Sequence, residues 1–467
     1  MNDAPSREKS LVKNTLVLTL GTSIPKVMSF ITLPLLTAYL SKAEYGTYDL
    51  ITVLVMFLLP IATLQIHTGA FRYLIEYRDD KEKCEQIITN ALINAVTLSI
   101  ISLVITGICL RNTEGIAFIL AYLFFDMYLI VIQQIARGSG NNMLYSASAI
   151  INSAVFMILT VLLVGTFQCG LIGAVCALLG GVFVASAYLT LKLHLFQSFK
   201  LHLASGKIVK MLLAYSWPIV PNSLCNWVLT LSDRLIITAF LGIEANAVLA
   251  VSNKLPNLLT IFQSSFSYAW QENASLTVRD KDASLYYENM FKSIVNFLTG
   301  GLSVLIGISP VIFGILIRGD YAEAFPQTAI LYLAMFYSCL ASFLAGIYAA
   351  NMKTVNIAIT TLAAALCNLL IDLCFVNFIG IYAASISTLA SNIVLTIYRM
   401  INVQHFQKIK FDIRLLIRNT GILCIMIAVL MCNKTIGNII NFILGIVMAV
   451  TLNKAILVKM VKKIRRL

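Results

Sequence analysis

Several charged and amide side chains stand inside stretches of the sequence that are otherwise apolar enough to cross a bilayer. Lys26 and Lys254 lie near the middle of such stretches, and Arg234 lies near the outer end of another. A charge near the bilayer centre costs roughly 2.5–3.5 kcal/mol, so it is retained where it faces a cavity, a partner or a ligand. All three cations are therefore candidates for binding an anionic substrate group. The alternatives are a buried ion pair for the lysines and a lipid headgroup contact for Arg234.

Three carboxylates accompany these cations. Asp126 lies near mid-membrane in its stretch, Asp372 lies in the outer part of another, and Asp233 directly precedes Arg234. Neighbours on a helix point about 100° apart, so Asp233 and Arg234 are not automatically partners. Each carboxylate can balance a lysine or bind a coupling H⁺ or Na⁺, and the sequence leaves both roles open.

Amide and hydroxyl side chains recur at helical spacing beside the cations, and Asn226 and Asn257 are the amides we expect to contact substrate. Such stripes line a watery cavity when several helices carry them. The structural alternative is hydrogen bonding between helices, at about 0.6 kcal/mol per contact. The first, fourth, fifth, seventh and eighth spans carry such stripes. Those of the seventh and eighth consist of Asn222, Asn226, Thr230 and Asp233, and of Asn253, Asn257, Thr260, Ser264, Ser267 and Gln271.

The elements that position these residues are membrane helices. The 467 residues are 59% hydrophobic and 12% charged, too little polar surface for a soluble globule of this length. Apolar runs of about 20 residues recur without the alternation of an outer-membrane barrel, which predicts an all-α polytopic membrane protein. We expect about fourteen spans, at 12–40, 48–70, 87–110, 115–136, 145–167, 169–192, 211–241, 244–270, 290–317, 325–349, 356–377, 379–400, 416–432 and 436–457.

The net charge of +13 follows the membrane topology and does not indicate a nucleic-acid partner. Lys and Arg gather at the termini and in every second connection, so the positive-inside rule places both termini in the cytoplasm. The same rule assigns Arg72, Arg137 and Arg399 to cytoplasmic helix ends.

The chain also repeats itself weakly. LTAYLSKAEYG at 36–46 aligns with ITAFLGIEANA at 237–247, although Ala247 replaces Gly46. We expect a six-helix lobe over 1–205, a second over 206–412, and two further helices with a basic tail over 413–467. Parallel repeats of this kind form transporters with a substrate site between the halves. Kinks are expected in the first span, which contains Pro25 and Pro34, and in the seventh, which contains Pro218 and Pro221.

No motif indicates an enzyme. The sequence has no phosphate-binding GxxxxGK[ST] loop, no HExxH and no paired-cysteine spacing, so we expect neither a metal nor an organic cofactor. A membrane polysaccharide polymerase or ligase remains the alternative from another class. Such an enzyme needs a sizeable outer loop, whereas the outer connections here are short.

The opening SLVKNTLVLTLGTSIPKVMSFITLPLLTAYLSKAEYGTYDL, followed by SDRLIITAFLGIEANAVLAVSNKLP, resembles the Wzx-type polysaccharide biosynthesis flippases. These belong to the multidrug/oligosaccharidyl-lipid/polysaccharide exporter superfamily, with the lipid II flippase MurJ and the multidrug and toxin exporters. The resemblance implies two six-helix lobes around a central cavity that opens alternately to either side of the bacterial inner membrane. Lipid II transport and multidrug export are the alternatives within the superfamily.

The resemblance also implies the substrate and the partners. The substrate is an undecaprenyl diphosphate-linked oligosaccharide for O-antigen, capsule or another surface polymer, and membrane lipid holds its tail. A polysaccharide polymerase and chain-length proteins are expected protein partners. Lys26, Lys254 and Arg234 would face the diphosphate, Asn226 and Asn257 the sugars, and Asp126, Asp233 or Asp372 a coupling ion.

Overall fold

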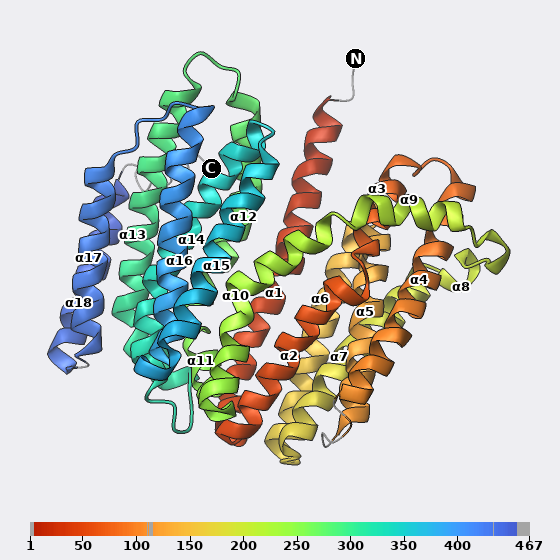
Figure 1. Cartoon of the computed structure of the whole chain (residues 1–467), viewed down its shortest axis with the longest axis horizontal. Helices are drawn as coiled ribbons and strands as arrows, with labels where there is room; N and C mark the ends of the chain where they lie inside the picture. Colours follow the sequence, from red (N-terminus) through yellow and green to blue (C-terminus); the bar gives the residue numbers. More distant parts are fainter. Residues whose placement is uncertain (1–3, 110, 112–114, 433, 455–467) are drawn as a thin grey trace. The chain divides into compact units, whose positions relative to one another are not determined.

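The computed structural model describes residues 4–109, 111, 115–432 and 434–454, and every regular element in these ranges is a helix (Figure 1). The all-α fold expected from composition is therefore confirmed. The chain divides into two compact units, residues 1–227 and 228–467, and α10 (Ile219–Leu241) contributes to both. The division into repeats at residues 205 and 412 stays a prediction. The basic tail expected at the C-terminus, residues 455–467, lies outside the described residues.

The helices of the first unit follow one another without a long irregular segment. They are α1 (Ala4–Tyr39), α2 (Lys42–Ala62), α3 (Ile66–Glu76), α4 (Lys81–Cys109), α5 (Ile116–Gly138), α6 (Asn142–Leu159), the π-helix η1 (Thr160–Thr166), α7 (Gly170–Lys192), α8 (Leu195–Ser198), the 3-10 helix η2 (Leu201–Leu203), α9 (Gly206–Ser216) and the start of α10.

The second unit begins within α10. Its further helices are α11 (Ile243–Ser252), η3 (Pro256–Leu258), α12 (Leu259–Thr277), α13 (Ala283–Leu316), α14 (Ala324–Ala350), α15 (Thr354–Ile379), α16 (Tyr382–Asn402), η4 (Val403–His405), α17 (Ile413–Met431) and α18 (Thr435–Leu452).

Thirteen helices in the described ranges are long and apolar enough to cross a membrane, against the fourteen spans expected. The difference is the eighth span, expected over 244–270. The chain leaves α11 after Ser252 and resumes as α12 at Leu259, with only the 3-10 turn η3 between them. Pro256, which lacks the backbone N–H that a continuous helix uses, lies at this break.

The start of α2 is held by a capping box. The Ser41 backbone N–H donates to Oε2 of Glu44 at 2.9 Å, and the Glu44 N–H donates to Oγ of Ser41 at 3.2 Å. Two backbone donors that the first helical turn leaves unpaired are thereby satisfied. Oε1 of Glu44 also accepts the Leu171 N–H at 3.2 Å, so this short connection fixes α2 to the start of α7.

Proline affects the two long spans differently. α1 continues unbroken through Pro25 and Pro34, whereas the seventh expected span separates into α9 and α10 at Trp217 and Pro218. The second span is also divided, because Leu64 and Gln65 adopt left-handed backbone angles with φ of 46° and 56°. Left-handed residues other than glycine cost about 1–2 kcal/mol each, so tertiary contacts must hold this turn.

One such contact comes from the start of α10. Nε2 of Gln65 donates to Oγ of Ser223 at 3.1 Å, and Nε1 of Trp227 donates to the Val53 carbonyl at 3.2 Å. The Trp227 ring also lies 4.5 Å from that of Phe57, centroid to centroid. The first two turns of α10 are thus fastened to α2 and to the turn after it.

The core of the first unit centres on α5, where Met127, Val131, Ile132 and Ala136 are fully buried. In the second unit α14 is the most enclosed of the membrane-length helices, since two thirds of its apolar span is buried. There the Trp270 ring stacks on Phe343 with centroids 4.4 Å apart, and its Nε1 donates to the Phe343 carbonyl at 2.8 Å. Each unit therefore has its own packed interior.

The two helices beyond the expected repeat pack within the second unit, where α18 lies along α13 (Figure 1). Gly445 permits this approach, because a Cβ built on it would lie 2.5 Å from the Ser303 carbonyl oxygen. α17 is joined to α13 by an amide pair, in which Nδ2 of Asn419 donates to Oδ1 of Asn296 at 3.0 Å. Small residues and amide bonds are the usual means of joining helices in lipid.

Candidate functional site

Two aspartates meet in the interior of the second unit. Asp233 on α10 and Asp372 on α15 are 7% and 0% exposed, and their carboxyl groups lie within hydrogen-bonding reach of each other. Two carboxylates at such a distance do not both stay ionised without a proton or a cation between them. The structure thus brings together two of the three carboxylates considered for ion coupling.

Hydroxyl and amide groups contact the pair, and the buried Arg234 is near enough to Asp233 for electrostatic interaction. The Thr388 hydroxyl on α16 donates to Oδ2 of Asp233 at 2.7 Å. Asn368, one turn before Asp372, accepts from the Ser232 hydroxyl at 3.4 Å and donates from Nδ2 to Oγ of Ser387 at 3.2 Å. These bonds tie α10, α15 and α16 together around the two carboxyl groups.

Apolar layers close the site along these three helices, with one residue each from α11 and α14. On one side lie Ile236, Ile237, Leu249, Val376, Ala383 and Ala384, and on the other Leu229, Ala341, Ala364, Ala365 and Leu395. Because these layers exclude water, electrostatic interactions at the two aspartates are stronger than they would be in water. Asn368 lies within hydrogen-bonding reach of the Asp233 carboxyl group and Ser387 within reach of the Asp372 carboxyl group, so polar side chains enclose the pair between these layers.

The donor set favours a proton or a hard monovalent cation. Carboxylate, amide and hydroxyl oxygens suit hard cations, whereas soft metals prefer sulfur and imidazole. Nowhere in the described ranges do three or more His, Cys, Asp or Glu side chains gather closely enough to hold a metal ion. The pair can therefore share one proton or enclose one small cation such as Na⁺.

The third carboxylate, Asp126, lies in the first unit on α5 and is half-buried. Tyr122, one turn earlier, is near enough to Asp126 and to Tyr48 for electrostatic interaction, and Tyr48 is followed by the buried Asp49. Asp126 therefore belongs to a separate polar cluster with phenolic neighbours.

Lys254 occupies the break in the eighth span. It follows α11 in a turn where its N–H donates to the Val251 carbonyl at 3.0 Å, and the Asn257 N–H donates to the Asn253 carbonyl at 3.0 Å. The Lys254 side chain is half-buried, and Asn257 is exposed. Non-helical backbone at membrane depth occurs where it is enclosed by protein or lines a watery cavity. The break therefore places Lys254 and Asn257 on one short irregular segment.

The other candidate substrate residues differ in exposure. Arg234 is 9% exposed, so the contact with a lipid headgroup considered for it does not match its buried position. In the first unit, Lys26 on α1 is half-buried, and Asn226 on α10 is exposed. Nδ2 of Asn226 donates to the Asn222 carbonyl at 2.9 Å, so this side chain of the polar stripe forms a hydrogen bond within its own helix.

The sequence did not reveal two features of the second unit: the polar neighbours of the aspartate pair and the burial of Arg399. Asn368 and Thr388 were not among the candidates, although Asn368 precedes Asp372 by four residues on an otherwise apolar span, which signals a shared helix face. Arg399 lies in the last turn of α16, in keeping with the helix-end position expected for it, but it is only 5% exposed.

The Arg399 guanidinium is held by neutral groups. It donates to Oγ1 of Thr360 at 3.1 Å, to Oγ1 of Thr361 at 3.0 Å and to the Ala341 carbonyl at 2.7 Å. These bonds connect α14, α15 and α16 beyond the apolar layer that contains Leu395.

Comparison with known proteins adds a family match. The family model described as "Polysaccharide biosynthesis protein" matches residues 11–274, more than half of the chain. No curated protein matches the sequence.

Solved structures match nearly the whole chain. The lipid II flippase MurJ in an inward closed conformation aligns with a TM-score of 0.69 at 14% identity, covering 96% of this chain and 100% of MurJ. An inward-facing multidrug resistance MATE family transporter of the MOP superfamily gives 0.69 at 14% identity, covering 84% and 99%. A MOP superfamily transporter from Pyrococcus furiosus gives 0.59 at 15% identity, covering 85% and 96%. At these identities the likeness establishes a shared fold.

Proposed function

Since the chain belongs to the polysaccharide biosynthesis protein family and has the fold of the MOP superfamily transporters, we propose that it moves lipid-linked oligosaccharides across a membrane. The substrate is an undecaprenyl diphosphate-linked repeat unit, and it crosses the bacterial inner membrane by alternating access. The product serves O-antigen, capsule or another surface polymer.

The observation that carries this proposal is the position of Lys254 in the short segment that separates α11 from α12. A diphosphate cannot enter hydrocarbon unaided, and a lysine ammonium is a compact charge that pairs well with phosphate oxygens. Asn257 on the same segment offers an amide to sugar hydroxyls. Lys26, Arg234 and Asn226 complete the proposed set, while the polyprenyl tail stays in lipid.

Energy for transport comes, in this proposal, from an ion gradient or the membrane potential. The sequence has no nucleotide-binding motif, and moving one charge through 100 mV supplies about 2.3 kcal/mol. Asp233 and Asp372 are the favoured pair for the coupling ion because their carboxyl groups adjoin in an apolar enclosure. Asp126 is the weaker candidate, since the neighbour shown for its carboxyl group is the phenol of Tyr122.

The proposal includes the orientation of the protein in the membrane and the proteins that act after it. Both termini lie in the cytoplasm by the distribution of Lys and Arg. A polysaccharide polymerase and chain-length proteins act on the exported units. The chain itself is a transporter and performs no glycosyl transfer.

Proteoliposomes with a fluorescent lipid-linked oligosaccharide test the proposal. We expect the protein to make inner-leaflet substrate accessible to an external lectin, and the Lys26→Gln/Lys254→Gln double variant to lose this activity. Lys353→Gln, at an exposed lysine between α14 and α15, is the matched control. Full activity of the double variant would exclude the cationic site, and absence of any flipping by wild-type protein would refute the function.

Lipid II transport is the second candidate, because the match to MurJ covers 96% of this chain while that to the MATE family transporter covers 84%. The same liposomes loaded with lipid II distinguish the two substrates. A clear preference for lipid II over the oligosaccharide carrier would reverse their order.

A further inference from the structure

A buried glutamine near the start of α14 leaves half of its amide group unused. Gln327 is 0% exposed, and its Oε1 accepts a hydrogen bond from the Ser385 hydroxyl on α16. Its Nε2 is also buried but has no hydrogen-bond partner within the part of the chain that the structure describes. A buried donor without an acceptor costs about 1–3 kcal/mol. The proposed binding of substrate and ion does not use Gln327, so this cost needs another explanation.

Gln327 is linked through α16 to the pair formed by Asp233 and Asp372. Its partner Ser385 stands three residues before Thr388 on α16. Thr388 is the residue that donates to Asp233. Residues three apart lie on one face of a helix, about 4.5 Å apart along its axis. The Gln327 amide and the aspartate pair therefore contact neighbouring turns of α16.

The glutamine lies closer than the aspartate pair to one end of the second unit. α14 and α16 run parallel, since Ser385 contacts Gln327 near the start of both helices. Further along, Arg399 contacts the Ala341 carbonyl. Gln327 is three residues into α14, whereas Thr388 is six residues into α16, about 9 Å from its start. Gln327 thus lies between the pair and the end of the unit at which these helices begin.

Apolar side chains close the direct way from the pair to that end. Ile236 and Ile237 follow Asp233 on α10, and Val376 follows Asp372 on α15. They pack in one buried layer with alanines of the first turn of α16. A cation would have to give up its water to cross this layer, which is costly. The amide and hydroxyl groups between α14 and α16 are the polar alternative.

Toward the other end of α16 the polar donors are engaged. Nδ2 of Asn392 donates to the Thr388 carbonyl at 2.8 Å, and the Thr396 hydroxyl donates to the Tyr337 carbonyl at 2.9 Å. These bonds hold the helix and its neighbour together and leave no unused donor on either side chain. The unused donor of this buried interface is therefore that of Gln327.

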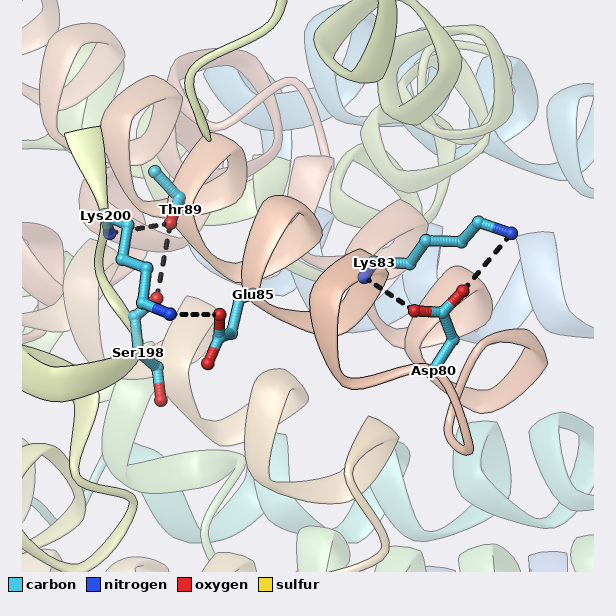
Figure 2. A network of polar contacts seen from close by, with 6 residues as sticks. All are labelled: Asp80, Lys83, Glu85, Thr89, Ser198 and Lys200. Carbon is cyan, nitrogen blue, oxygen red and sulfur yellow. Dashed lines mark hydrogen bonds and ion pairs between the residues drawn. The ribbon is translucent and has the colours of Figure 1, made fainter. Parts of the chain in front are cut away.

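Contacts that fasten one segment to another in the first unit are likewise complete. Nζ of Lys200 lies 2.6 Å from Oε2 of Glu85 (Figure 2). The Lys83 N–H donates to Oδ1 of Asp80 at 3.1 Å, and this bond holds the Asp80 pKa below its usual value. In both contacts donor and acceptor meet at a partly exposed position. A fastening of this kind does not require the unpaired amide nitrogen seen at Gln327.

The Gln327 amide is suited to handle water and a cation in turn. In the observed orientation Nε2 can donate to the oxygen of a water molecule. A half-turn about the last side-chain torsion exchanges the two amide atoms, so that Nε2 donates to Ser385 and Oε1 is released. Carbonyl oxygens of this kind bind hard cations.

An acidic side chain stands one turn further out. Glu323 directly precedes α14, is exposed, and comes four residues before Gln327, so both lie on one face of the helix. A carboxylate at the surface raises the local concentration of cations. Glu323, Gln327 and Ser385 therefore lead from the surface to the turn of α16 that contacts Asp233.

We propose that Gln327 and Ser385 form an access site for the coupling cation, H⁺ or Na⁺ with its water, on its way between the surface and the aspartate pair. The inference rests on the proposed function, since it takes the pair as the binding site of that ion. The access site governs how fast the pair fills and empties, and not how much ion it holds. In the proposed orientation α14 and α16 begin on the outer side, so an ion that drives export by moving inward enters here.

Stopped-flow mixing of the full-length protein in detergent, with a pH indicator dye, tests the access site. If the pair binds H⁺, a drop from pH 8 to pH 6 should cause proton uptake. If it binds Na⁺, adding Na⁺ at pH 8 should release the proton that the two carboxyl groups share. In either case the kinetic phase that belongs to the pair is the one that disappears in Asp372→Asn.

Gln327→Met keeps the size of the side chain but removes both amide atoms. We expect it to slow this phase about tenfold, equivalent to about 1.4 kcal/mol in the barrier, and to leave its amplitude unchanged. Gln327→Glu retains an oxygen ligand and should stay close to the wild-type rate. Gln407→Met, at a half-buried glutamine beyond the other end of α16, is the matched control and should not change the rate.

An exposed position provides an independent test, because Gln327→Met alters a fully buried side chain. Glu323→Gln should slow the same phase roughly threefold at low ionic strength and leave it unchanged at high ionic strength, where salt screens the carboxylate. Its melting temperature should equal that of wild-type protein.

The outcomes separate the access site from the ion site. Unchanged rates in both Gln327→Met and Glu323→Gln would overturn the access site and leave the pair as the ion site. A smaller amplitude in Gln327→Met would make this residue a ligand of the bound ion, which also overturns the proposal. Absence of any response to H⁺ or Na⁺ in wild-type protein would instead remove the coupling role of the pair, and the access site with it.

Discussion

The Thr388 hydroxyl donates a 2.7 Å hydrogen bond to Oδ2 of Asp233, beside the carboxyl group of Asp372. The bond joins α16 to α10, and Asp372 adds α15 to the same site. A proton or cation that binds here acts on three helices at once. This arrangement gives the proposed coupling ion a direct means of changing how the helices of the second unit pack.

Asp372→Asn is the first test of ion binding. The change keeps the shape of the side chain but removes the like-charge repulsion with Asp233, so binding of a coupling ion should be lost. For wild-type protein we expect the melting temperature to rise either when Na⁺ replaces choline at pH 8 or when the pH falls from 8 to 6. A ligand at 100 times its Kd stabilises by about 2.7 kcal/mol.

In Asp372→Asn the response that wild-type protein shows should disappear, and Asp233→Asn should behave in the same way. The control is Asp320→Asn, which alters a carboxylate in the exposed connection between α13 and α14. A wild-type response that survives in both pair variants would assign ion binding to another site.

Thr388→Val probes the hydrogen bond to Asp233. Valine has a similar shape but no hydroxyl, so Oδ2 of Asp233 loses a donor worth about 1.5–3 kcal/mol when its partner is charged. We expect the ion concentration for half-maximal stabilisation to change at least tenfold, measured by thermal shift. Thr388→Ser retains the donor and should stay close to wild type. Equal behaviour of the two variants would mean that the hydroxyl takes no part.

Lys254→Gln should abolish export of surface polymer, because the irregular segment after α11 loses its positive charge while glutamine keeps most of the side-chain length. Lys254→Arg should retain at least a tenth of wild-type export, since it keeps the charge. Polymer on the cell surface is quantified against the amount of inserted protein. Normal export by Lys254→Gln would show that the diphosphate binds elsewhere.

Arg399→Lys should destabilise the protein more than Arg399→Met. Lysine brings a buried charge without the planar fork that reaches Thr360, Thr361 and Ala341, and an unsatisfied buried charge costs about 3 kcal/mol or more. Methionine fills similar space without a charge. Melting temperatures measured in detergent show which variant is less stable. A lower melting temperature for Arg399→Met than for Arg399→Lys would indicate that Arg399 needs its charge for a bound anion.

Gly445→Ala should loosen α18 from α13. Its Cβ would meet the Ser303 carbonyl oxygen at 2.5 Å, and overpacking of this kind costs about 1–3 kcal/mol. Gly314→Ala on α13 is the control, because no atom lies within 4 Å of its Cβ and alanine favours a helix. Melting temperatures should fall for the first variant and stay level or rise for the second.

The sequence by itself determined the class of the protein and most of its helices. Apolar runs of about 20 residues are local features, and the need to satisfy backbone hydrogen bonds in lipid makes each of them a helix whatever its neighbours do. The resemblance carried by the first span and by the Asp233–Arg234 stretch identified the family, which the match over residues 11–274 confirms. The charges inside spans were also visible, since they interrupt apolar runs.

The tertiary structure decided which of those charges belong together. Asp233 and Thr388 are 155 residues apart, and nothing in the spacing of either helix shows that their faces meet. The same holds for Arg399, whose neutral partners come from α14 and α15. The break at Lys254 likewise depends on the neighbours of α11, because a proline allows several backbone paths. Helix formation is governed by short-range hydrogen bonds, but the choice of facing surfaces depends on packing over the whole unit.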